Sequence, residues 1–280
     1  MTARRKATRP GRPGSGADPR RAATYVYCVA RSARPPDLRS APGGMPGAGK
    51  PRAVAAGPQL WLVVADAPLP RYGEAPLARL VRDLDAVSRC AVAHSAVVAH
   101  CARRYPVIPL RLLTLFTDDG RALARVRRHR GAIARRLTRV AGRAEWGIQA
   151  RLEADSGRSA RRARAAARTE TAGLSSGTRF LELRRRQREA ARGLAGGARA
   201  AAASLYRALA RHADAARQRP PVSVDGRPAL LLDAAFLVPA TRAATFRQAV
   251  RAQAAMAADR GLHVRLTGPW PPYSFVAGRL

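Results

Sequence analysis

The feature that most limits how this chain can fold is a short segment near its end, residues 268–275, with the sequence GPWPPYSF. Proline fixes φ and lacks a backbone donor, so the segment cannot be a helix or a central strand, and we expect a stiff, extended or turning stretch. Stiffness lowers the entropy lost when aromatic side chains are held in place. These side chains cover the protein's own core, form a docking edge for another protein, or do both, with one aromatic buried and the next exposed. The candidate partner-binding residues are Trp270, Pro271, Pro272, Tyr273 and Phe275.

The chain of 280 residues has room for one large or two ordinary domains, and its hydrophobic content of 47% suffices for real cores. Its formal net charge is +34, and arginine supplies 50 of its 52 basic residues because Lys6 and Lys50 are the only lysines. Such a charge suits a nucleic acid or another polyanion. A GC-rich genome also produces chains rich in Ala, Arg, Gly and Pro, so the charge alone is weak evidence for a nucleic-acid role.

The ends and the cysteines indicate a cytoplasmic protein. Residues 1–22 are basic and contain Pro and Gly, without the apolar stretch of a secretory signal, so we expect a disordered arm. No apolar run approaches the about 20 residues that cross a bilayer. The odd number of cysteines (Cys28, Cys90 and Cys101) fits free thiols in a reducing compartment.

The residue patterns predict an α+β protein of two domains. In the first half we expect strands at 24–30, 60–65 and 107–116, helices at 76–104 and from an Asp118 cap to 143, a long loop at 34–58, and a flexible glycine-rich part at 43–49. In the second half we expect strands at 145–152, 222–224, 229–238 and 262–267, a helix at 178–216, and a helix capped by Thr241 and closed by Gly261.

From residue 145 onward the predicted order is β-α-β-β-α-β, which is typical of a ferredoxin-like fold. We therefore predict an N-terminal α+β domain at 23–143, a variant of that fold, and a C-terminal ferredoxin-like domain at 144–280 with an extended Pro/aromatic tail. Residues 156–176, rich in Arg and Ala, are interpreted as an insertion.

Several motifs along the chain resemble the GvpL/GvpF family of gas vesicle proteins over about residues 24–276. They are Tyr25, His94, VIPLRLLTLF at 107–116, Glu145-Trp146-Gly147, Gly177 ahead of Phe180-Leu181, and the terminal GPWPPYSF. The chain departs from the family where members typically have Arg-Phe-Gly-Thr and this sequence has Arg111-Leu112-Leu113-Thr114.

The resemblance implies a cytoplasmic accessory protein of gas vesicle assembly and a minor component of the vesicle. Its implied partners are the major, hydrophobic shell protein and other gas vesicle accessory proteins. It implies no enzymatic activity and no cofactor, and the absence of a long apolar run predicts no membrane role.

Two groups of residues invite a more specific role. Cys90 and His94 lie one helical turn apart, which suits a metal pair, but Cys101 is about 16 Å from Cys90 along the helix and further ligands are missing. We therefore expect no metal site, and a buried, hydrogen-bonded His94. Glu145 forms an ion pair with Arg111 at a domain junction or is an ordinary strand-edge carboxylate, and Trp146 beside it is a candidate structural residue of that junction.

The alternative function is a basic nucleic-acid-binding module with a ferredoxin-like sheet. No strand carries the aromatic pattern of such modules, and the arginines are spread widely, so we expect only nonspecific polyanion binding. Binding that disappears smoothly with salt identifies the nonspecific kind. The sequence also lacks a Gly-x-Ser-x-Gly nucleophile elbow and a phosphate-binding P-loop.

Overall fold

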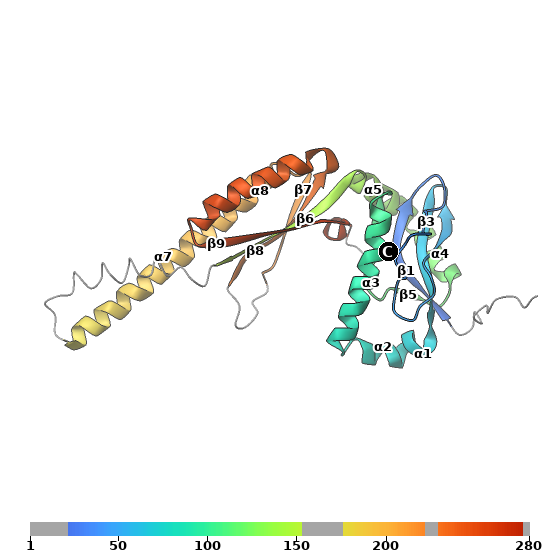
Figure 1. Cartoon of the computed structure of the whole chain (residues 1–280), viewed down its shortest axis with the longest axis horizontal. Helices are drawn as coiled ribbons and strands as arrows, with labels where there is room; N and C mark the ends of the chain where they lie inside the picture. The colour runs from blue at the N-terminus through green and yellow to red at the C-terminus, as the bar shows by residue number, and fades with distance from the viewer. Residues whose placement is uncertain (1–21, 153–175, 222–228, 277–280) are drawn as a thin grey trace, which may run out of the picture. The chain divides into compact units, whose positions relative to one another are not determined.

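The computed structural model describes residues 22–152, 176–221 and 229–276, which form two compact units (Figure 1). Of the described residues, the first unit contains 22–105 and 110–130, and the second contains 106–109 and those from 131 onward. The division thus falls one helix before the boundary expected at 143/144. In the turn after that helix the Gly142 carbonyl accepts a hydrogen bond at 2.9 Å from the amide of Ala240, a residue of the second unit.

The first sheet has the order β2-β3-β1-β4, and β5 pairs with β1. The strands and helices up to residue 128 are β1 (Ala22–Arg31), β2 (Arg52–Gly57), β3 (Leu60–Pro68), α1 (Leu69–Tyr72), α2 (Glu74–Leu80), α3 (Leu84–Ala102), β4 (Val107–Pro109), β5 (Leu115–Phe116) and α4 (Asp119–Arg128). The interior of β1 is buried along its whole length, as its β-branched and aromatic composition predicts for a central strand.

The long loop expected at 34–58 is only partly a loop. Its last part forms β2, which pairs antiparallel with β3. The glycine-rich part packs on the core, because Met45 is buried and its amide donates to the Tyr27 hydroxyl at 2.8 Å. Gly44 permits this approach, since it has φ +82° and a Cβ there would lie 2.3 Å from the Tyr27 hydroxyl. This stretch is a loop, as predicted, and Gly44 and Met45 in its middle lie against the core; its predicted flexibility stays a prediction.

The single strand predicted at 107–116 is also wrong. Residues 110–114 separate β4 from β5 as a turn, in which the amide and hydroxyl of Thr114 donate to the Arg111 carbonyl. Leu113 has φ +62°, a left-handed conformation that no strand contains. The apolar sequence of this stretch concealed the turn.

The long helix predicted from Asp118 to residue 143 is two helices, α4 and α5 (Arg130–Val140), separated at His129. Its predicted start is confirmed, because the Asp118 carboxylate accepts from the Arg121 amide at 2.8 Å. The break explains why Arg130 stands where a continuous helix would need an apolar residue, since the periodicity restarts there.

The second unit is built on an antiparallel sheet of order β7-β8-β6-β9. Its further elements are β6 (Arg143–Leu152), α7 (Ser176–Ala210), β7 (Ala215–Arg219), β8 (Leu230–Pro239), the 3-10 helix η2 (Ala240–Arg242), α8 (Ala243–Ala258), β9 (Leu262–Trp270) and the 3-10 helix η3 (Tyr273–Phe275). The helices α7 and α8 lie side by side and cover one face of this sheet (Figure 1).

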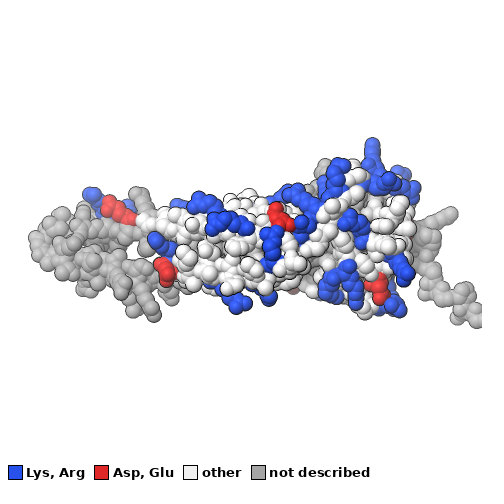
Figure 2. Space-filling view, turned by 90° about the horizontal axis from the view of Figure 1, so that it is seen from above, with Lys and Arg blue, Asp and Glu red and all other residues white. Residues whose placement is uncertain are grey.

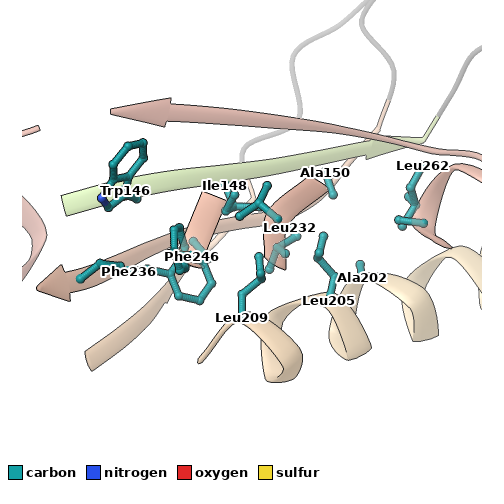
Figure 3. Packing of buried hydrophobic residues seen from close by; sticks show 14 of the residues in the cluster. Trp146, Ile148, Ala150, Ala202, Leu205, Leu209, Leu232, Phe236, Phe246 and Leu262 are labelled. Atoms are coloured by element: carbon teal, nitrogen blue, oxygen red, sulfur yellow. The ribbon is translucent and has the colours of Figure 1, made fainter. Parts of the chain in front are cut away.

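The core of the second unit lies between this sheet and the two helices (Figure 3). Alternate residues of β6 point into it, from Trp146 to Ala150, and meet Phe236 of β8 and Phe246 of α8. Phe236 and Phe246 have ring centroids 5.5 Å apart. The intervening residues of β6, including Glu145, therefore face the side of the sheet that carries no helix.

Several predicted boundaries in this half shift. The helix predicted at 178–216 ends at Ala210, and β7 occupies part of its expected length. Thr241 lies in η2 and caps nothing, because α8 begins at Ala243 without a side-chain cap. Gly261, with φ +72°, follows α8 as predicted. Residues 1–21 of the predicted arm, 156–175 of the insertion, the predicted strand at 222–224 and its turn lie outside the described residues.

Candidate functional site

The Pro/aromatic segment begins inside an edge strand. Its first residues, Gly268 to Trp270, complete β9, which lies beside β6 at one edge of the sheet formed by the described strands. The strand therefore runs beyond its predicted end at residue 267. An edge strand accommodates Pro269 because the proline's missing N–H can face away from the ladder.

A bulge at Gly268 sets the direction of the segment. Thr267 is opposite Gly147 and Trp270 is opposite Glu145, so β9 contains one more residue than β6 between these pairs. Gly268 has φ +114°, and a Cβ there would lie 2.8 Å from the Glu145 carbonyl oxygen. Only glycine satisfies both the conformation and this close approach.

Glu145 and Ser274 hold the far end of the segment against the sheet. The Ser274 amide donates to Oε2 of Glu145, and the Ser274 hydroxyl donates to Oε1, both at 2.7 Å. Arg217 of β7 donates from Nη1 to the Ser274 carbonyl at 2.8 Å, and its guanidinium lies 5.9 Å from the centre of the Phe275 ring. We call Glu145, Ser274 and Arg217 the latch.

The electrostatics of the latch centre on a buried carboxylate. Burial raises the pKa of Glu145 above its usual value. The hydrogen bonds from Ser274 and the positive charges of Arg219 and Arg217 oppose this shift. The Glu145 carboxylate is thus a fixed hydrogen-bond acceptor for Ser274 in the η3 turn.

The segment divides between buried and exposed residues. Pro271, Pro272 and Phe275 are buried and Tyr273 is partly buried, whereas Trp270 keeps 50% of its surface exposed. Core coverage and partner contact are therefore separable within one segment. Trp270 is the most exposed aromatic residue of the segment.

The latch contacts of Glu145 belong to neither sequence prediction, which were an ion pair with Arg111 and an ordinary strand-edge carboxylate. Glu145 is buried on β6, an inner strand of the sheet, so it is not a strand-edge carboxylate. Arg111 is exposed in the first unit, and its pairing with Glu145 of the second unit stays a prediction. Trp146 points the opposite way into the core, where its ring lies 6.2 Å from that of Phe246.

His94 lies in the core of the first unit. Its Nδ1 is 2.7 Å from the Tyr25 hydroxyl, which also accepts from the Leu113 amide at 3.3 Å. Its ring stacks on Tyr27 with centroids 5.7 Å apart. Burial lowers the pKa of His94 to about 4, so the imidazole is neutral near pH 7.

His94 of α3 thus forms a hydrogen bond with Tyr25 of β1. Cys90, one turn earlier on α3, is buried. Among the residues that the structure describes, no group of three or more His, Cys, Asp or Glu side chains is placed to hold a metal ion.

The sequence analysis missed Ser274 and Arg217. Ser274 stands 129 positions from Glu145 in the chain, and no local pattern links the two residues. The sequence gives one indirect signal for them. Glu145 is an acid among apolar neighbours on a strand, and a buried carboxylate needs a hydrogen-bonding partner.

The fold and the segment define the class of the protein. It is an α+β protein of two antiparallel sheets with an aromatic segment fixed at a sheet edge. The family model described as gas vesicle synthesis protein GvpL/GvpF matches residues 23–277, and the chain belongs to this family.

Similar proteins agree with this assignment. Gas vesicle protein L of Streptomyces sp. (strain CB03234) is 32% identical over 256 residues, which cover 90% of this chain and 91% of that protein. The crystal structure of GvpF from Anabaena sp. PCC7120 has a TM-score of 0.64 at 14% identity, covering 91% of this chain and 96% of the other. GvpF from Microcystis aeruginosa has a TM-score of 0.61 at 15% identity, covering 91% and 99%.

None of the described helices is both long enough and apolar enough to cross a membrane.

Proposed function

We propose that this chain is a cytoplasmic, non-enzymatic accessory protein of gas vesicle assembly that binds the hydrophobic shell protein, with Trp270 as a central contact. Family membership supports the gas vesicle role. The observation that carries the contact is the exposure of Trp270 at the end of β9, next to the latch that fixes the following turn. By supporting vesicle formation, the protein contributes to the buoyancy of the cell.

A fixed, half-exposed tryptophan suits the capture of an apolar partner. The large ring offers apolar area, and the rigid segment has little conformational freedom left to lose on binding. Tyr273, partly buried in η3 three residues further on, is the second candidate contact of the segment. The edge of β9 next to it adds a strand-pairing opportunity for an extended partner segment.

We further infer that the second unit is a ferredoxin-like domain with this segment as its tail. The chain order β6-α7-β7-β8-α8-β9 and the sheet order β7-β8-β6-β9 support this inference. In such a fold one sheet face carries both helices, and the latch lies on the other face. The first unit, with its additional strand β2, is the proposed variant.

A pull-down on immobilised major shell protein tests the proposal. Trp270→Ala should weaken retention by about 2 kcal/mol or more, which is about 30-fold, since buried aromatic anchors dominate interfaces. Adding Tyr273→Ala should weaken it further. Val92→Ala is a matched control, because Val92 is 71% exposed on α3 of the first unit.

Circular dichroism of each variant separates binding from folding. If Trp270→Ala is folded and still binds like the wild type, the assignment of Trp270 is wrong. If the variant unfolds, Trp270 belongs to the core and is not a contact.

A specific nucleic-acid role has no comparable support. Figure 2 shows Lys and Arg side chains distributed over the face that it presents, with few acidic residues among them. Charge distributed in this way favours nonspecific, salt-sensitive attraction of polyanions.

A further inference from the structure

A groove runs along the helix layer of the second unit, where α7 and α8 lie side by side (Figure 1). Its volume is about 330 Å³. Its lining includes Gly197, Ala201 and Leu205 of α7, Met256 and Ala257 of α8, and Arg260 in the turn after α8. The groove is separate from the latch, because the helices cover the sheet face opposite to Glu145.

The groove has an apolar floor and one charged end. Leu205 and Ala257 are buried beneath it, and Met256 beside it is 64% exposed, more than any other large apolar side chain described in the second unit. Arg260 lies at one end of the lining, and its guanidinium has no hydrogen bond or ion pair within the described part of the chain. An exposed apolar side chain beside a concave surface commonly marks an interaction site.

The shape of the groove fits a helix. Its lining residues recur at intervals of three or four positions on each helix, for example at Gly197, Ala201 and Leu205, so the groove follows the helix axes. Glycine and alanine along one wall allow a third helix to approach closely, so that its ridge of larger side chains can enter the groove.

The positive charge around the groove favours a partner with negative charge. Residues 196–210 of α7 and 243–260 of α8 and its following turn contain five arginines and one acid, Asp259. Arg260 itself lines the groove. A partner with carboxylates on its polar side would pair with this surface, whereas a basic partner would be repelled.

From these observations we propose that the groove between α7 and α8 docks an acidic amphipathic helix of a partner protein, with a carboxylate of that helix on Arg260. This surface is additional to the Trp270 contact, and its binding does not depend on the proposed function. A protein with both surfaces can hold two partner segments at once.

The test uses the full chain and a fluorescent synthetic peptide of about 18 residues, or five helical turns, with Leu and Ala on one face and Glu on the other. Fluorescence anisotropy should show saturable binding of this peptide. The same peptide with Lys in place of Glu should bind at least about tenfold more weakly, because it faces the arginines.

Two glycine variants locate the binding. Gly197→Leu places a side chain in the groove and should weaken binding by about tenfold or more, a typical effect of removing a well-packed contact. Gly196→Leu is the matched control, since Gly196 does not line the groove and should leave binding unchanged. A Cβ at either position meets no atom within 4 Å, and leucine favours helix over glycine, so both variants should fold.

A charge pair gives an independent check. Arg260→Glu should weaken binding more than Arg251→Glu, which changes an exposed arginine of α8 outside the lining. Absence of saturable peptide binding, or equal effects of the two leucine variants, would overturn the proposal. Competition by single-stranded RNA combined with no effect of Gly197→Leu would also overturn it, because the surface would then attract polyanions without a groove.

Discussion

The latch makes a testable prediction about how the terminal segment is held. In Glu145→Ala, Ser274 loses the acceptor of both its amide and its hydroxyl. Each of these two hydrogen bonds to a charged group contributes about 1.5–3 kcal/mol net, or about 3–6 kcal/mol together. Loss of the buried charge recovers part of this, so we expect a cost of about 2–4 kcal/mol. Glu145→Gln keeps the shape and an acceptor, and should cost less than about 1 kcal/mol.

Amide hydrogen exchange of the peptide covering residues 268–276 measures this cost locally. Opening that is easier by 2–4 kcal/mol makes exchange about 30- to 700-fold faster in Glu145→Ala. Glu145→Gln should exchange at a rate near that of the wild type. Asp259→Ala, which removes an exposed acid next to α8, is the control and should have no effect on this peptide.

The pH dependence of the free energy of unfolding tests the electrostatic contribution of Glu145 to stability. Burial raises the pKa of Glu145 in the folded chain above the unfolded value of about 4.3. Between these two pKa values the folded chain binds more protons, so the free energy of unfolding falls as pH rises. Acidification through this range should therefore stabilise the wild type relative to Glu145→Gln. The reasoning fails if the difference has the opposite sign, or if Glu145→Ala exchanges like the wild type.

Two predictions concern the first unit. Leu113→Gly should stabilise this unit by about 0.5–1 kcal/mol, because relief of the left-handed conformation (about 1–2 kcal/mol) exceeds the entropic cost of glycine. Leu112→Gly is the control and should destabilise the unit, because Leu112 has no positive φ. Thermal unfolding that ranks the two variants the other way would contradict this prediction. The pKa of His94 is lowered to about 4 in the folded chain, so between pH 4 and about 6.5 the imidazole is protonated in the unfolded chain and neutral in the folded one. The free energy of unfolding of this unit should therefore fall by about 3 kcal/mol as pH falls through this range. Amide exchange of β1 at several pH values should show this loss in the wild type and a smaller one in His94→Gln, and equal losses would show that another group titrates.

The elements that the sequence predicted best depend on local chemistry. The buried strand β1 follows from its run of β-branched and aromatic residues, and the start of α4 from the Asp118 cap. Gly261 could be placed after α8 because a positive φ at a helix end is a property of one residue and its neighbours.

The errors occurred where a contact between distant residues overrides the local pattern. The loop around Gly44 gave no sign of a partner in the sequence, but the Tyr27 hydroxyl binds it to the first sheet. The stretch from Val107 looked like one strand, but a turn at Leu113 places an amide near the Tyr25 hydroxyl. Sequence periodicity contains no information on either partner.

The candidate site shows the same limit. The prolines of residues 268–275 by themselves determined that the segment is stiff and stays out of a helix or an inner strand, because proline acts on its own backbone. Only the tertiary structure decided that Phe275 is buried and Trp270 exposed, because that choice depends on Glu145 and Arg217, which pairing within the sheet brings to Ser274 from far along the chain.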